Sequence, residues 1–224
     1  MILYAVFAAV QRAVKSPLMD LAILTRRPVA AGTFLILVAT ALMIAVFFLG
    51  SFYLQHHQGY GPLRTGLLFL PVAVATILGA QLAGRSIGSA GARKIAATGL
   101  LTAAAGTAIA AIWDGPVTVV AGISLGAAGI GAAFVASSAT TLSQVAHHEA
   151  GTASGLLSTF HEFGAALGVA VVSSIAAASI AGTTGTGFTG GFTFAAVTAA
   201  IAALLALLVV PTTKPPAGAA THTR

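Results

Sequence analysis

Six long apolar stretches constrain the fold of this chain more than any other feature of its sequence. Each is long enough to cross about 30 Å of hydrocarbon as a helix that rises about 1.5 Å per residue. They span residues 33–54, 65–84, 95–113, 116–142, 153–178 and 188–210. Charged residues make up only 6% of the chain, whereas soluble proteins carry about 25%. The sequence therefore predicts an integral membrane protein with no room for a soluble domain.

The six stretches are helices rather than strands of a membrane barrel. Barrel strands alternate apolar and polar residues over about ten positions, and residues 35–48 show no such alternation. Pro71 lies inside the second stretch and predicts a kink there. Asp114-Gly115-Pro116 predicts a turn with proline at the first helical position of the next helix. The predicted fold class is an all-α membrane protein with six transmembrane helices.

The basic residues predict how the helices are oriented. An even number of spans places both ends of the chain on one side, and that side receives nine of the ten basic residues, the exception being Arg64. The nine are Arg12, Lys15, Arg26, Arg27, Arg85, Arg93, Lys94, Lys214 and Arg224. Basic loops stay in the cytoplasm, so we expect a multi-pass plasma-membrane protein with both termini cytoplasmic. The net charge of +6 then reflects topology, and no nucleic-acid partner is expected.

The two ends of the chain lie outside the six spans. Residues 1–10 are apolar but too short to cross a bilayer, and no basic residues precede them as in a signal peptide. Residues 1–32 are therefore interpreted as the end of a truncated transmembrane helix followed by a cytoplasmic linker. Residues 211–224 are polar and rich in proline, which predicts a disordered cytoplasmic tail. The sequence thus reads as a fragment.

Several segments match the residue patterns of enzyme motifs but lack the secondary structure or the remaining residues that those motifs require. Gly122-Ile-Ser124-Leu-Gly126 spells a nucleophile elbow, which needs a turn from strand to helix, but it lies within a membrane span. Gly185-Thr-Gly187-Phe-Thr-Gly190 follows a membrane helix instead of the strand that a dinucleotide site requires. His148 and His161 each begin an H-E-x-x-H pattern whose second histidine is absent. We therefore expect no enzyme, no metal site and no cofactor.

Glycine pairs four residues apart predict close helix packing. Small residues at this spacing let membrane helices approach each other where no hydrophobic effect drives association. The three pairs are Gly122 and Gly126, Gly151 and Gly155, and Gly164 and Gly168.

Glu162 is the first candidate for a transport path. It lies nine residues inside the span 153–178, where an ionisable side chain is costly unless it faces a cavity or a partner. Ser158 and Thr159 share its helical face, and Ser137 and Thr141 on the preceding span could line the same path. Two alternatives stay open: Glu162 could bond to a neighbouring helix or extend towards the interface, and the hydroxyls could bond their own helix carbonyls.

Two sets of motifs resemble a known family. The segments Gly61-Pro62-Leu63-Arg64-Thr65-Gly66, Gly91-Ala92-Arg93-Lys94 and Gly126-Ala127-Ala128-Gly129-Ile130-Gly131 resemble the C-terminal half of major facilitator superfamily transporters. Ala150-Gly151-Thr152-Ala153-Ser154-Gly155-Leu156, followed by Phe163-Gly164-Ala165-Ala166-Leu167-Gly168, is similar to a signature of the fourteen-helix drug/proton antiporters of the EmrB/QacA type.

The resemblance implies one half of a major facilitator bundle, built from inverted three-helix repeats and working by alternating access. Arg85, Gly91 and Arg93 would belong to the family's cytoplasmic loop, where Gly84 stands in place of the usual aspartate. His161-Glu162 replaces the family's common Arg-Gln. The implied partners are the lipid bilayer, the missing N-terminal half, protons and a small-molecule substrate.

The resulting expectation is proton-coupled multidrug efflux with this chain as the C-terminal half. A truncated membrane fragment or scaffold that transports nothing is the alternative, and an intramembrane enzyme is a distant third.

Overall fold

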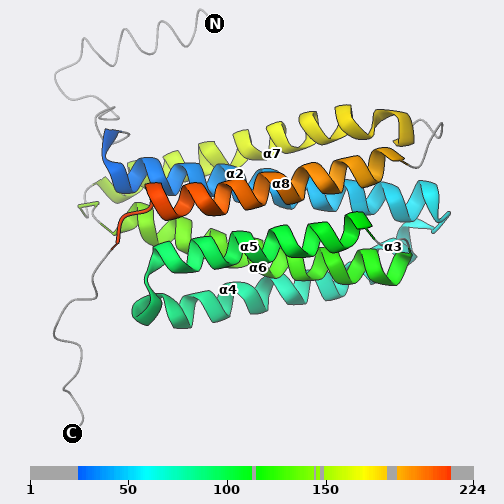
Figure 1. Ribbon diagram of the computed structural model, residues 1–224. Coiled ribbons are helices and arrows are strands. Elements are labelled where there is room, and N and C mark those ends of the chain that lie inside the picture. The colour runs from blue at the N-terminus through cyan, green and yellow to red at the C-terminus, as the bar shows by residue number, and fades with distance from the viewer. Residues whose placement is uncertain (1–24, 113–114, 144, 147–148, 181–185, 213–224) are drawn as a thin grey trace, which may run out of the picture.

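The computed structural model describes residues 25–112, 115–143, 145–146, 149–180 and 186–212 (Figure 1). These residues form helices and no strands. The elements are α2 (Arg27–Phe52), the π-helical turn η2 (Tyr53–His57), α3 (Pro62–Leu68), α4 (Leu70–Ala90), α5 (Ala92–Ile112), α6 (Pro116–Leu142), α7 (Ala150–Ile180) and α8 (Thr186–Val209).

The six predicted membrane helices are confirmed. Within the described chain, six helices are long and apolar enough to cross a membrane, and the fourth, Pro116–Leu142, has the predicted bounds. The other five spans begin before their predicted first residues; α2, for example, begins at Arg27 instead of residue 33. The reason is that apolar composition marks the hydrocarbon thickness, whereas a helix can continue into the polar interface. The predicted truncated helix within residues 1–24 and most of the predicted tail, residues 213–224, lie outside the described residues.

Pro71 was predicted to kink the second span, and the structure divides that span into two helices just before it. Helix α3 ends at Leu68, Phe69 caps it, and α4 begins at Leu70 with Pro71 in its first turn. Proline has no N–H to donate to the carbonyl of Leu67, so the hydrogen-bond ladder is interrupted one turn before it.

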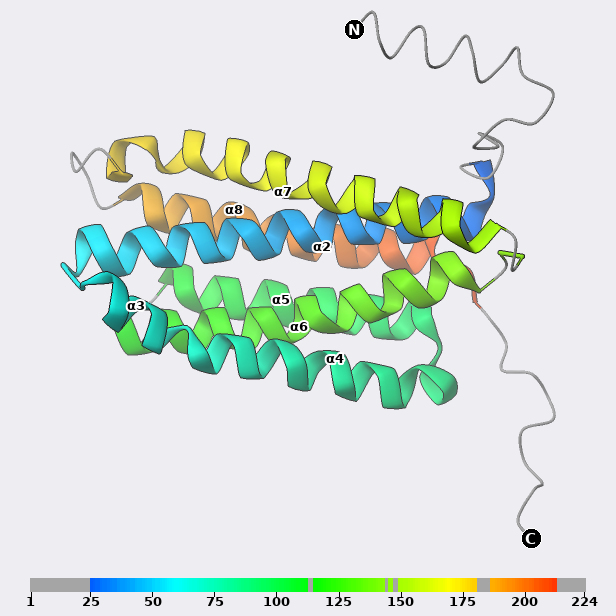
Figure 2. The ribbon, with the colours of Figure 1, turned by 180° about the vertical axis from the view of Figure 1, so that it is seen from behind.

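The helices form two layers. Figure 2 shows α7, α2, α6 and α4 side by side in that order, with α8 and α5 behind them. Figure 1, from the opposite side, places α8 and α5 in front. The contacts agree: α2 packs on α7, α6 and α8, and α6 packs on α2, α4 and α5. Helices α2 and α6 are therefore the most buried of the six spans, and α4 and α7 are the most exposed.

Glycines set the contact between α5 and α6. A Cβ on Gly99 would lie 2.7 Å from the carbonyl oxygen of Gly129, and a Cβ on Gly122 would lie 2.7 Å from that of Gly106. Real Cβ atoms almost never approach so closely. The two backbones therefore touch directly, which is how membrane helices gain packing energy without a hydrophobic drive.

Candidate functional site

One side of α2 and α6 is left uncovered by the second layer. Helices α5 and α8 cover the other side of this central pair, and α4 and α7 flank it (Figure 2). This uncovered side is bounded by α4 and α7. The candidate path residues lie on α6 and α7, which both pack against α2.

Helix α7 lies on α2 through two of the predicted glycines. A Cβ on Gly164 would lie 3.0 Å from the Cα of Leu37, and a Cβ on Gly168 would lie 2.9 Å from the Cα of Ala41. Glu162 precedes Gly164 by two residues, about 200° around a helix of 3.6 residues per turn. Its side chain consequently points away from α2 and is exposed.

The other candidates on α7 share this exposed surface. Ser158 and Thr159 are both exposed, and the Thr159 hydroxyl donates to the carbonyl of Gly155 at 2.9 Å. A Cβ on Gly151 or Gly155 would have no neighbour within 4 Å. The first turns of α7 thus present small and polar residues on their exposed side, and the predicted packing role of Gly151 and Gly155 stays a prediction.

Ser137 and Thr141 lie between α2 and α6. Both side chains are fully buried, and the Ser137 hydroxyl donates to the carbonyl of Gly32 at 2.8 Å. The Thr141 hydroxyl lies directly against Gly32, where a Cβ would collide with it, and it has no hydrogen-bond partner within the described chain. In this conformation the two residues hold α2 to α6.

His161 occupies the junction of three helices. Its Nδ1 lies 3.0 Å from the hydroxyl of Thr40 on α2, and its ring centroid lies 5.7 Å from that of Phe134 on α6. Helices α6 and α7 otherwise touch little, so the imidazole connects them across α2. Thr40 is buried, whereas His161 is half-buried.

Basic residues at the start of α2 tie three helix ends together on the predicted cytoplasmic side. The guanidinium of Arg26 forms a bidentate ion pair with Glu149, with nitrogen–oxygen distances of 2.8 and 2.9 Å. Arg27 donates to the carbonyl of Leu208 at the end of α8, at 3.0 Å. Cations are unfavourable at a helix N-terminus, so these contacts offset a local cost. We call Arg26, Arg27, Glu149 and Leu208 the inner clasp.

The predicted cytoplasmic loop joins α4 to α5. Gly91 has φ of +82°, which favours glycine, and its N–H donates to the carbonyl of Ile87 at 2.9 Å. Arg85 is exposed, Arg93 is half-buried, and neither has an ion-pair partner among the residues that the structure describes. The loop therefore has the tight turn of the motif, and its charges face outward.

At the opposite ends of the helices, Tyr53 joins α2 to α6. Its buried hydroxyl accepts hydrogen bonds from the N–H of Gly115 at 3.1 Å and from the side-chain amide of Gln58 at 3.0 Å. Gly115 caps α6, and Pro116 occupies its first turn as predicted. Arg64, the basic residue predicted on this side, stacks its guanidinium over the ring of Tyr60 at 3.7 Å.

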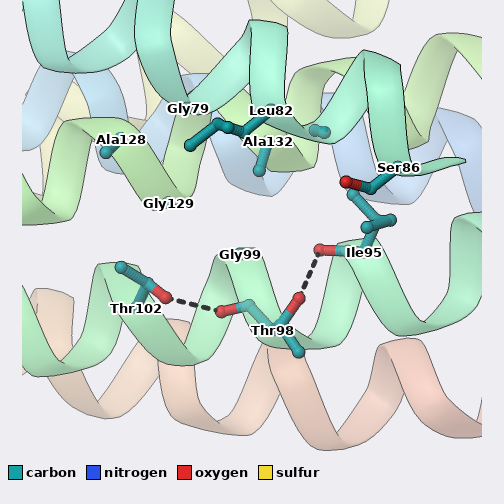
Figure 3. Close-up of a pocket in the computed structure, with 11 residues that line it drawn as sticks. Gly79, Leu82, Ser86, Ile95, Thr98, Gly99, Thr102, Ala128, Gly129 and Ala132 are labelled. Carbon is teal, nitrogen blue, oxygen red and sulfur yellow. Dashed lines mark hydrogen bonds between the residues drawn. The ribbon is translucent and has the colours of Figure 1, made fainter. Parts of the chain in front are cut away.

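A pocket of about 250 Å³ lies between α4, α5 and α6 (Figure 3). Its two threonine hydroxyls are bonded within their own helix: Thr98 donates to the carbonyl of Ile95, and Thr102 to that of Thr98. A second pocket of about 170 Å³ between α2, α7 and α8 is almost entirely apolar. Neither contains an ionisable side chain, and the described residues include no group of three potential metal ligands.

The roles of His161 and of the inner clasp were not predicted from the sequence. There, His161 stood in an incomplete metal motif and in the His161-Glu162 pair that replaces the family's Arg-Gln, and Arg26 and Arg27 served to predict orientation. An ionisable residue in mid-span was a usable signal for His161, as it was for Glu162. No pattern in the sequence could pair Arg26 with Glu149, because 123 positions separate them.

The sequence of the chain is similar to a known protein family. The sequence profile of the Major Facilitator Superfamily matches residues 36–224. The puromycin resistance protein pur8 of Streptomyces alboniger is 31% identical over 184 residues, which cover 78% of this chain and 36% of that protein.

Two further relatives give the same picture. The multidrug resistance protein Stp of Mycobacterium tuberculosis is 29% identical over 181 residues, covering 80% of this chain and 34% of the relative. The tetracenomycin C resistance and export protein of Streptomyces glaucescens is 28% identical over 189 residues, which cover 79% of this chain and 34% of that protein. The chain therefore spans about a third of the length of these relatives.

Proposed function

Because the chain belongs to the Major Facilitator Superfamily, we propose that it forms the C-terminal half of a proton-coupled exporter of small molecules that works by alternating access. The relatives named for resistance and export support efflux as the activity. We also propose the fourteen-helix antiporter subfamily, location in the plasma membrane and cytoplasmic termini, on the motifs and charge distribution described above.

The observation that carries this proposal is the polar surface of α7 in the middle of the membrane. Glu162 lies twelve residues after Ala150, about 18 Å along the helix at 1.5 Å per residue. It is exposed, and no hydrogen bond or ion pair within the described chain satisfies it. A carboxylate at this depth is costly against lipid. A water-filled path or a second protein unit beside α7 is the arrangement that removes this cost.

A missing half fits this requirement. The chain covers about a third of each relative, so the remaining helices of a longer transporter are available to cover α7 and α4. These are also the two least buried spans. The substrate would then cross between the two halves, with protons exchanging at Glu162.

Efflux assays on Glu162 variants test this function. In a strain lacking its own exporters, we expect the transporter containing this chain to lower accumulation of amphipathic antibiotics and dyes. Glu162→Gln should reduce efflux, and Glu162→Asp, which keeps the carboxylate, should retain more of it. Unchanged efflux by a normally expressed Glu162→Gln protein would remove Glu162 from the mechanism.

The alternative is a membrane fragment or scaffold that transports nothing, and the short coverage of the relatives favours testing it. If the chain is half of a transporter, the 224 residues should confer no resistance when produced alone, and co-production of the upstream half should restore resistance. If no upstream half is encoded and no pairing restores efflux, the fragment interpretation holds.

A further inference from the structure

The hydrogen bond between Thr40 and His161 differs from those of other threonines in these helices. Thr33, Thr76 and Thr107 each donate to the backbone carbonyl one turn earlier, at 2.8–3.0 Å. Thr40 makes no such bond, and His161 is the partner of its buried hydroxyl within the described chain. Since the Thr40 hydrogen is not used within its own helix, it is available to His161. When the Thr40 hydroxyl donates, Nδ1 of His161 is the acceptor, and a neutral ring then holds its hydrogen on Nε2.

The second ring nitrogen has no partner within the described chain. His161 is half-buried and lies eleven residues after Ala150, about 16 Å along the helix. An N–H group facing hydrocarbon at this depth would be left without a hydrogen bond, which is costly in a membrane. The exposed edge of the ring therefore requires water, substrate or another polar group beside it, as Glu162 does.

Few charges surround the ring. Helix α6 contains no ionisable residue between Pro116 and Leu142, and along α2 and η2 the nearest are Arg27 and Tyr53, each thirteen residues from Thr40. On α7 the neighbour is Glu162, which points to a different side of the helix. Glu162 is thus the one ionisable neighbour of His161 on these three helices. Proton uptake by the ring therefore changes the net charge at the junction of α2, α6 and α7.

We propose that His161 is a proton-binding positioning residue of the transport cycle and that it acts on α2 through Thr40. This inference rests on the proposed proton-coupled transport. One proton adds to Nδ1 and forms the imidazolium, so both ring nitrogens become donors. The Thr40 oxygen then accepts from Nδ1, and its hydrogen turns to the carbonyl of Ile36, as in the other threonines. Protonation thereby reverses the direction of the hydrogen bond between α2 and α7.

Chemical modification of the 224-residue chain in lipid nanodiscs tests the site without requiring transport. Diethyl pyrocarbonate reacts with unprotonated imidazole, and peptide mass spectrometry resolves each histidine. We expect modification of His161 to fall as the pH is lowered from 8.5 to 5.5, because the imidazolium does not react. Thr40→Val frees Nδ1 and should raise the reactivity of His161 about two- to tenfold, the worth of one neutral hydrogen bond.

His57 provides the matched control. It is exposed and has no hydrogen bond to another side chain in the described chain, so Thr40→Val should leave its reactivity unchanged. Equal reactivity of His161 with and without the Thr40 hydroxyl, or reactivity that does not vary between pH 5.5 and 8.5, would overturn the proposal.

Efflux measured from pH 5.5 to 8.5 tests the role in transport. His161→Asn places an amide near the position of Nδ1 but cannot take up a proton, so we expect its efflux to lose the pH step of the wild type. His57→Asn should keep that step. A His161→Asn transporter with the wild-type pH profile would refute the role. If the wild type itself shows no efflux, the proposed function fails, whereas the modification experiment still decides whether His161 binds a proton in contact with Thr40.

Discussion

Two glycines on the same helix should respond in opposite ways to the same substitution. Gly168 packs against α2, and a Cβ added there would lie 2.9 Å from the Cα of Ala41, where 3.4–4 Å is an ordinary contact. Helix α7 must therefore move away by about 0.5 Å or more, and such overpacking costs about 1–3 kcal/mol. Gly155 has nothing within 4 Å of its added Cβ, so alanine there should gain the helix preference of about 0.5–1 kcal/mol.

The magnitude follows from these two terms. Gly168→Ala combines the packing cost with the same helix gain, so we expect a net loss of up to about 2.5 kcal/mol and a difference of about 1–3 kcal/mol from Gly155→Ala. At about 2–4 °C per kcal/mol for a chain of this size, the unfolding midpoints should differ by about 2–12 °C. Thermal unfolding of the purified 224-residue chain in one detergent measures this gap. Equal midpoints, or a more stable Gly168→Ala variant, would refute the contact between α7 and α2.

Two further contacts lead to measurable outcomes in the same assay. Arg26→Glu and Glu149→Arg should each lower the unfolding midpoint, and the double exchange should recover part of the loss. The bidentate pair is partly exposed, so it is worth about 1 kcal/mol. A double variant that is no more stable than the single variants would argue against the pair. Tyr53→Phe should cost about 1–2 kcal/mol, since it leaves the N–H of Gly115 without its acceptor, and an unchanged midpoint would show that this bond does not hold α6.

The helices could be predicted because a bilayer imposes a length and a composition that are visible in sequence. The span 116–142 was predicted to the residue, since Pro116 marks its start and polar residues follow Leu142. The break at Phe69 followed from Pro71 for an equally local reason. The other spans begin before their apolar stretches, as α2 does, because hydrogen bonding within a helix does not stop at the edge of the hydrocarbon.

The candidate site was harder to predict because it depends on which way each side chain points. Polarity alone placed Ser137 and Thr141 with Glu162, yet the two hydroxyl residues are buried against Gly32 while Glu162 faces outward. Helical spacing grouped Ser158 and Thr159 with Glu162 on one face, and all three are exposed. Whether that face lines a transport path depends on residues that cover α7, and a single chain carries no information about them.

Within the inner clasp, Arg26 contributes first to helix insertion and later to helix packing. Membrane helices insert first and pack afterwards. During insertion only positive charge matters, so lysine at position 26 would serve the proposed orientation as well as Arg26 does. During packing, geometry matters, because only a guanidinium presents the planar fork that meets both oxygens of Glu149. A lysine variant would therefore enter the membrane in the same orientation and still assemble less firmly, which separates the biogenesis of this protein from its final stability.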